Sequence, residues 1–173
     1  VRRLEELHLI DRDDKGGLKP SNPDELLEAW LEAYDFSSHQ IIKGHVAARS
    51  GEELLKKMTR ILSGQKVDYA ATGLAGAWQY THFTKFRMVT LFLADSPGKN
   101  IFDQLHFRED DRGANTWLVV PNDKGVFHGS LDQAGIVCVH PVQVILDLKG
   151  HPERAKEAAS MVRQEKLKWR RDA

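Results

Sequence analysis

The segment VHPVQVILDLKGHPERAKEAASMVRQEKLKW, residues 139–169, predicts two consecutive helices near the end of the chain. Pro141 suits the first position of a helix, because its fixed φ fits the turn and its missing N–H would have no partner there. Gly150 can adopt a positive φ and is expected to end this helix. Pro152 is expected to start the second helix, with Glu153 in its first turn, where a carboxylate interacts favourably with the helix dipole.

Apolar residues recur at helical spacing on one face of each predicted helix, which indicates that both helices pack against a core. This face consists of Val142, Ile145 and Leu146 in the first helix and of Ala155, Ala158, Ala159 and Val162 in the second. The opposite face of the second helix is basic. This basic face is a candidate contact surface for a partner. More often, such a run of charges is simply the solvent-exposed face of a helix.

The middle of the chain mixes strand and helix patterns. Short apolar runs predict strands at residues 39–47, 67–71, 88–93, 117–120 and 136–139. Helical spacing predicts a helix at 51–64, and a run of small residues predicts a tightly packed helix at 72–80. Residues 121–125 are expected to close a hairpin towards 126–128, and residues 101–107 to lead into a polar loop. This order predicts an α/β (α+β) fold with one mixed central sheet covered by helices.

The first 36 residues are expected to form a separate segment from residues 37–173. Residues 1–10 place apolar side chains on one helical face, and residues 11–22 are polar with a glycine turn. A helix followed by a glycine-turned ribbon resembles the second half of a winged helix, with the wing tip at 15–19. A helix-turn-helix needs an earlier helix to brace the recognition helix. We therefore expect a remnant of a winged helix here, from a module that begins before Val1.

The basic residues of this segment allow two interpretations. As part of a winged helix they would contact DNA phosphates; they are Arg2, Arg3, Arg12, Lys15 and Lys19. As part of an ordinary amphipathic helix they would be balanced by neighbouring carboxylates. Residues 1–36 hold 5 basic and 10 acidic residues, a net charge of −5, which argues against strong non-specific DNA binding by this segment alone.

A connecting helix is predicted after this ribbon. Asn22 or Ser21 can cap it, and Pro23 suits its first turn. Its apolar positions recur at helical spacing through Trp30 and Tyr34. Four residues that lie on the apolar faces of their helices are expected to be largely buried: Trp30, Trp78, Leu146 and Ala158.

Composition narrows the classes of protein that the chain can belong to. Lys plus Arg and Asp plus Glu are 25 each, so the net charge is zero and gives no global attraction to nucleic acid. The single cysteine, Cys138, lies in an apolar run and is expected to be a buried small hydrophobe rather than a nucleophile. No apolar run approaches the ~20 residues of a membrane helix, and no signal peptide is visible. These features predict a cytoplasmic protein without a membrane partner.

Few residue patterns indicate catalysis. Asp147-x-Lys149 superficially fits the end of a restriction-nuclease-type site, which would need both residues on a strand beside a second carboxylate. Pro141 and Gly150 frame a helix instead, so the more ordinary interpretation is that Asp147 accepts structural hydrogen bonds. The eight histidines show no metal-ligand spacing, and no phosphate-binding loop is present. We expect no catalytic residue, no metal and no cofactor.

Two motifs, together with Leu-Leu-x-x-Trp at residues 26–30 in the connecting helix, resemble the AbiEi-type antitoxins of type IV toxin–antitoxin systems. One is Tyr-x-x-Thr-Gly-x-Ala-Gly-Ala-Trp at residues 69–78. The other is spread over the two C-terminal helices and consists of Pro141, Val142, Gln143, Asp147, Leu148, Pro152, Arg154, Glu157, Ala158 and Ala159. Family members often have Gly where this sequence has Ala155, and paired alanines where it has Gly76.

This resemblance implies a bacterial DNA-binding transcriptional regulator and antitoxin rather than an enzyme. Its winged helix would repress its own operon, and residues 37–173 would oppose a nucleotidyltransferase-like toxin encoded beside it. Its partners would be promoter DNA and that toxin. The resemblance also favours the DNA-contacting interpretation of the N-terminal basic residues. The alternative is a nucleic-acid-processing enzyme with a nuclease-like α/β domain, which predicts a cluster of carboxylates near Asp147 and Lys149.

Overall fold

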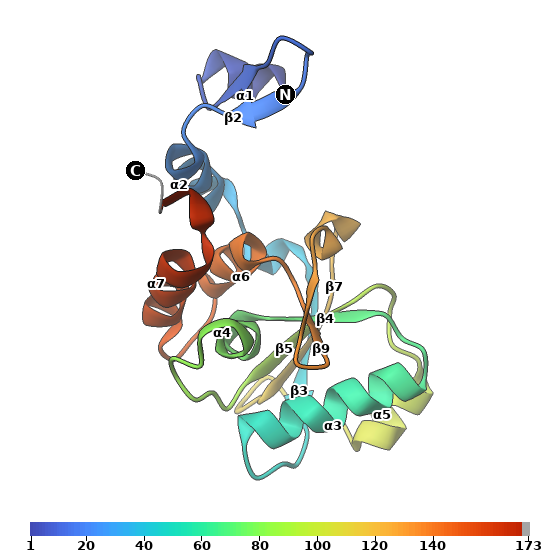
Figure 1. Cartoon of the computed structure of the whole chain (residues 1–173). Helices are drawn as coiled ribbons and strands as arrows, with labels where there is room; N and C mark the ends of the chain where they lie inside the picture. The colour runs from blue at the N-terminus through green and yellow to red at the C-terminus, as the bar shows by residue number, and fades with distance from the viewer. Residues whose placement is uncertain (171–173) are drawn as a thin grey trace. The chain divides into compact units, whose positions relative to one another are not determined.

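A computed structural model describes residues 1–170 of the chain (Figure 1). They divide into two compact units, which we describe separately. One comprises Val1–Asp35 with the described end of the chain from Lys168, and the other comprises Phe36–Leu167. Residues 171–173, the last part of the basic C-terminal end, lie outside the described residues. None of the helices in residues 1–170 has the length and apolar character needed to cross a membrane.

The first unit contains two helices and a two-stranded ribbon, with a short 3₁₀ turn, η3 (Lys168–Arg170), from the end of the chain. Helix α1 (Arg2–Glu6) precedes the antiparallel strands β1 (Ile10–Arg12) and β2 (Leu18–Pro20). Between the strands, the Asp13 carboxylate accepts hydrogen bonds from the backbone N–H groups of Lys15 and Gly17, which closes the turn.

Helix α2 (Pro23–Ala33) begins where a capping residue is available. The Asn22 side chain accepts hydrogen bonds from the backbone N–H groups of Asp24 and Glu25, and its amide donates to the Glu25 carboxylate at 3.0 Å. This reciprocal pair resembles a capping box and satisfies donors that a helix start leaves without intrahelical partners.

The apolar faces predicted for these helices are only partly buried. Helix α1 ends at Glu6 and buries none of its residues, and Leu7, which follows it, is 56% exposed. In α2 only Leu27 is buried, whereas Trp30 is 48% exposed. The prediction that Trp30 is largely buried was therefore wrong. Helical spacing shows which side chains share a face, but it does not show that a neighbour covers all of that face.

The second unit is built on a seven-stranded mixed sheet in the order β6-β3-β7-β5-β4-β9-β8. Neighbouring strands are parallel in the β5–β7 and β4–β9 pairs and antiparallel in the others. The strands are β3 (Gln40–His45), β4 (Tyr69–Thr72), β5 (Val89–Leu93), β6 (Arg108–Glu109), β7 (Thr116–Val120), β8 (Leu131–Gln133) and β9 (Ile136–Cys138). All five residues of β5 are buried, as expected for a strand covered on both faces. The predicted mixed α/β fold is confirmed.

Helices cover both faces of this sheet (Figure 1). They are α3 (Gly51–Gly64), α4 (Gly73–Thr81), α5 (Lys99–Leu105), α6 (Pro141–Leu148) and α7 (Ala155–Lys166). Thr116 of β7 contacts Met58 of α3, whereas the next residue, Trp117, lies against His151, which follows α6. Because successive residues of a strand point to opposite faces, α3 and the end of α6 lie on opposite sides of the sheet.

Helices α4, α6 and α7 pack against one another in one layer. Helix α4 uses small residues for this purpose. A Cβ at Gly76 would come within 3.1 Å of the Ala71 carbonyl oxygen and 3.3 Å of a Val144 methyl group. Leu146 and Ala158 are buried as predicted, at 0% and 1% exposure. Trp78 is half-buried rather than largely buried, and its ring lies beside those of His82 and Phe86.

Three local predictions were wrong, and one helix was not predicted. Residues 99–105, which were expected only to lead into a polar loop, form helix α5. Residues 124–127 form a 3₁₀ turn, η2 (Lys124–Phe127), and the hairpin lies further on, between β8 and β9. Helix α7 begins at Ala155 rather than at Pro152. Gly150 has no positive φ; the left-handed residue is Glu153, at φ +64°. A further 3₁₀ turn, η1 (Phe36–Ser38), precedes β3.

Candidate functional site

The most concentrated group of buried polar side chains in the second unit lies between the sheet and α6. It comprises Thr72 at the end of β4, Thr90 in β5, Gln143 and Asp147 in α6, and His151 just beyond α6; we call it the polar cluster. Asp147 and Thr72 are 0% exposed. A carboxyl group buried in this way needs hydrogen-bond donors, because removing it from water is costly.

The Asp147 carboxyl receives donors from two elements. The Thr72 hydroxyl donates to Oδ2, and the Gln143 amide donates to Oδ1 at 2.8 Å. Gln143 lies one helical turn before Asp147, whereas Thr72 lies 75 residues away in the sequence. The Thr72 bond therefore fastens α6 to the end of β4, whereas the Gln143 bond lies within α6. Both bonds confirm that Asp147 is a structural hydrogen-bond acceptor.

His151 extends the cluster to β5. Its Nδ1 lies 2.7 Å from the Asp147 backbone carbonyl oxygen and its Nε2 lies 2.9 Å from the Thr90 hydroxyl. A carbonyl oxygen can only accept, so Nδ1 carries the proton, and Nε2 of a neutral ring then accepts from Thr90. Burial lowers the pKa of His151 to about 4, against the opposing effect of the hydrogen bond to the Asp147 carbonyl. His151 is therefore neutral at pH 7.

Close packing holds the His151 ring in place. The ring centroids of Phe36 and Trp117 lie 4.9 and 5.0 Å from that of His151. Gly73 leaves the space that the imidazole fills, because a Cβ at this position would come 2.6 Å from Nε2. Gly73 also has a φ of +59°, in the left-handed region that favours glycine. Conformation and space thus both require glycine here.

This arrangement lacks the features of the nuclease-like alternative. Asp147 lies on a helix and is buried, whereas Lys149 is exposed at the C-cap of the same helix. The alternative also predicts a carboxylate cluster at this point. Within residues 1–170, no three side chains of His, Cys, Asp and Glu are grouped as ligands of a metal ion would be.

Cys138 is buried as predicted. Its burial, and to a smaller extent the nearby Asp132, raises the pKa of its thiol to about 12.

The four polar and charged residues of the motif in the two C-terminal helices, apart from prolines and apolar residues, separate into two groups. Gln143 and Asp147 belong to the polar cluster. Arg154 and Glu157 lie at the start of α7 and form an ion pair of 3.5 Å with more than half of each side chain exposed. The Arg154 guanidinium also lies 5.2 Å from the centroid of the Phe83 ring. An exposed pair of this kind contributes little to stability.

The basic residues predicted to contact DNA lie in the first unit and differ in their partners. Arg2 pairs with Glu6 at 3.1 Å within α1, and Arg12 pairs with Glu5 at 2.6 Å, joining the ribbon to α1. The remaining three make no ion pair with any residue of 1–170; they are Arg3, Lys15 and Lys19.

Sequence reasoning did not assign roles to Thr72, Thr90 and His151. Thr72 stood within a recognised motif, but that motif was interpreted only as the start of a closely packed helix. His151 follows Gly150 in a stretch that reads as an ordinary interhelical connection. The signal that could have found them is long-range, because each side chain acquires its partner only when the sheet and α6 come together.

The fold and the polar cluster define a mixed α/β domain in which buried polar side chains fasten a helical layer to a sheet. The sequence matches the family described as transcriptional regulators, AbiEi antitoxins of type IV toxin–antitoxin systems, over residues 19–168. The chain therefore belongs to this family. Both motifs that suggested the resemblance lie within the matched region, which begins in β2 and excludes α1 and β1. No curated protein and no solved structure matches the chain.

Proposed function

We propose that the chain is a DNA-binding transcriptional regulator and antitoxin that acts in the cytoplasm, represses its own operon and opposes a nucleotidyltransferase-like toxin encoded beside it. The observation that carries this proposal is the family membership over residues 19–168. In this proposal the DNA contacts belong to the first unit and the antitoxin function to the second.

The order of elements in the first unit supports the DNA-binding half of the proposal. Helix α1 followed by the β1–β2 ribbon has the order of a recognition helix and a wing. Lys15 lies in the turn of this ribbon and Lys19 on β2, both exposed. Because Arg3, Lys15 and Lys19 make no ion pair within residues 1–170, we assign the main phosphate contacts to these three. Arg2 and Arg12 would contact DNA only by exchanging their carboxylate partners for phosphates.

The DNA-binding half of the proposal is tested by titrating promoter DNA with the wild-type protein and with variants, at two salt concentrations. Each phosphate contact releases counterions, so the Lys15→Ala/Lys19→Ala variant should reduce the slope of log K against log[salt] by roughly two. The control is Lys56→Ala/Arg60→Ala, which removes two exposed cations from α3 in the second unit. Equal slopes for the wild type and the Lys15/Lys19 variant would contradict the assignment, as would an equal loss in the control.

Co-expression with the adjacent toxin gene tests the antitoxin half. The full chain should relieve the growth arrest that the toxin causes. The Lys15→Ala/Lys19→Ala variant should relieve it equally well at matched protein levels, because the second unit is intact. Continued arrest at matched levels would contradict an antitoxin role and leave the DNA-binding result unaffected.

A further inference from the structure

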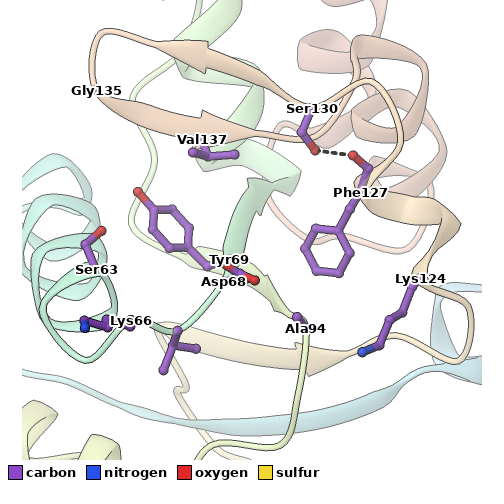
Figure 2. Close-up of a pocket in the computed structure, with 11 residues that line it drawn as sticks. Ser63, Lys66, Asp68, Tyr69, Ala94, Lys124, Phe127, Ser130, Gly135 and Val137 are labelled. Atoms are coloured by element: carbon purple, nitrogen blue, oxygen red, sulfur yellow. Dashed lines mark hydrogen bonds between the residues drawn. The ribbon is translucent and has the colours of Figure 1, made fainter.

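A hollow of about 750 Å³ opens in the second unit, away from the polar cluster (Figure 2). Residues around the end of α3, the start of β4, the end of β5, η2 and the β8–β9 hairpin line it. Its volume falls within the range of small-molecule sites in proteins. Its lining combines apolar surfaces with a few polar groups, which is the usual composition of such sites.

Hydrogen-bond donors gather at one end of the hollow. Figure 2 shows the Tyr69 hydroxyl pointing away from Phe127, towards the side on which Ser63 and Lys66 lie. Tyr69 is only 9% exposed, yet its hydroxyl makes no hydrogen bond within residues 1–170. The hydroxyl oxygen itself is not fully enclosed by the protein, so it can donate to a molecule in the hollow. The Ser63 hydroxyl and the Lys66 ammonium also make no bond to any described side chain or backbone group.

The backbone at Lys66 is a second unusual feature of this end. Lys66 has a φ of +56°, a left-handed conformation that follows the end of α3. Glycine adopts this conformation at less cost than a residue with a Cβ. The lysine side chain thus stands beside the hollow at a position whose backbone conformation glycine would adopt at lower cost.

The other end of the hollow is apolar and partly aromatic. Phe127 of η2 lines this part, and Val137 of β9 lies on the wall between Phe127 and Tyr69 (Figure 2). Lys124 lies beside it, and its ammonium is 3.4 Å from the Asp95 carboxylate with both side chains largely exposed. Asp68 adds a carboxylate to the lining, which can accept hydrogen bonds but opposes an anion placed next to it. An anionic group is therefore favoured at the Lys66 end, and a planar ring at the Phe127 end.

We propose that this hollow binds a mononucleotide. The phosphate accepts hydrogen bonds from Lys66, Ser63 and Tyr69, and the base lies against Phe127 and Val137. This wall suits a nucleobase, because the flat face of any of the bases can stack on an aromatic side chain. Asp68 accepts from a ribose hydroxyl or a base amino group. The site is independent of DNA binding and of a toxin, and it adds a ligand-binding function to the chain.

Isothermal titration of the full chain with adenosine 5′-monophosphate, adenosine and inorganic phosphate tests the proposal. The nucleotide should bind saturably. Adenosine and phosphate should each bind at least about tenfold more weakly, because each retains only one half of the contacts. Absence of saturable nucleotide binding at millimolar concentration would overturn the proposal, and so would equally tight binding of phosphate alone.

Two substitutions test separately the end of the hollow proposed to bind the phosphate and the end proposed to bind the base. Lys66→Ala should weaken nucleotide binding about tenfold and leave adenosine binding unchanged, since a charge-assisted hydrogen bond is lost only with the phosphate. Phe127→Ala should weaken both ligands. Lys56→Ala removes an exposed α3 lysine that does not line the hollow and should change neither. Circular dichroism melts identify the variants that remain folded. Nucleotide affinity unaffected by Lys66→Ala in a folded variant would refute the site.

Discussion

Gly73 provides the sharpest test of how the polar cluster is built, because replacing it with alanine imposes two separate costs. The first is conformational, since its φ of +59° lies in the left-handed region, where a residue with a Cβ costs about 1–2 kcal/mol. The second is steric, because the new Cβ would lie 2.6 Å from the Nε2 atom of His151. Relieving this overlap moves the imidazole away from both of its hydrogen-bond partners, at about 0.5–1.5 kcal/mol each. We expect Gly73→Ala to lower the free energy of unfolding by about 2–5 kcal/mol.

Gly135→Ala separates the two costs. Gly135 has a φ of +84°, but a Cβ there would meet no atom within 4 Å. This variant should therefore lose only the conformational part, about 1–2 kcal/mol. Gly64→Ala lies in α3 with open space around it and a φ outside the left-handed region, so it should be neutral or slightly stabilising.

The assay is urea unfolding followed by circular dichroism, for the single variants and for Gly73→Ala in a His151→Ala background. Without the imidazole, Gly73→Ala should cost no more than Gly135→Ala, because the steric part is gone. The difference between the two backgrounds then measures the contact between residues 73 and 151. An equal cost of Gly73→Ala in both backgrounds would refute the reasoning, and so would a cost equal to that of Gly135→Ala in the wild-type background.

Two further predictions concern burial. The folded-state pKa of His151 is lowered to about 4 from its ordinary value of 6.5, so the unfolded chain binds the proton more tightly. The stabilisation from keeping this ring neutral is fully present above about pH 6.5 and is lost as the pH falls towards 4, by about 3 kcal/mol in total. Urea unfolding between pH 7 and 4 should show a shallower pH dependence for His151→Asn than for the wild type, and parallel curves would contradict the prediction. Ala158→Glu places a carboxylate at a position that is 1% exposed and should cost about 3–5 kcal/mol. Ser160→Glu, on the exposed side of the same helix, should change stability by less than about 0.5 kcal/mol, and thermal melts in which the two variants behave alike would show that the helix face is wrong.

Much of the local structure could be predicted from short stretches of sequence. Helix α3 begins and ends where its pattern predicts, at Gly51 and Gly64, with the Ser50 hydroxyl accepting from the Glu53 backbone N–H. Buried positions on α6 and α7 were predicted by the same periodicity, as Leu146 and Ala158 show. These features depend on interactions within a few residues, so a single segment contains the information that determines them.

Other outcomes depended on which segments meet. The apolar spacing of Trp30 is as regular as that of Leu146, yet Trp30 is 48% exposed and Leu146 is 0% exposed. Residues 99–105 form helix α5 although their short pattern is ambiguous, and α5 packs against α3. Periodicity defines a face of a helix, but only the tertiary structure decides how much of that face a neighbour covers.

By itself, the sequence determined the family of this protein, its mixed α/β class and the identity of the residues in its two motifs. It did not determine that the motifs meet. Thr72 and Asp147 are 75 residues apart, and the hydrogen bond between them exists only because α6 packs against β4, which in turn lies next to β5. The same arrangement brings Gly73, Thr90 and His151 together. Such contacts depend on strand order and helix placement, which are set by the combined packing of the whole unit and leave no short-range pattern in the chain.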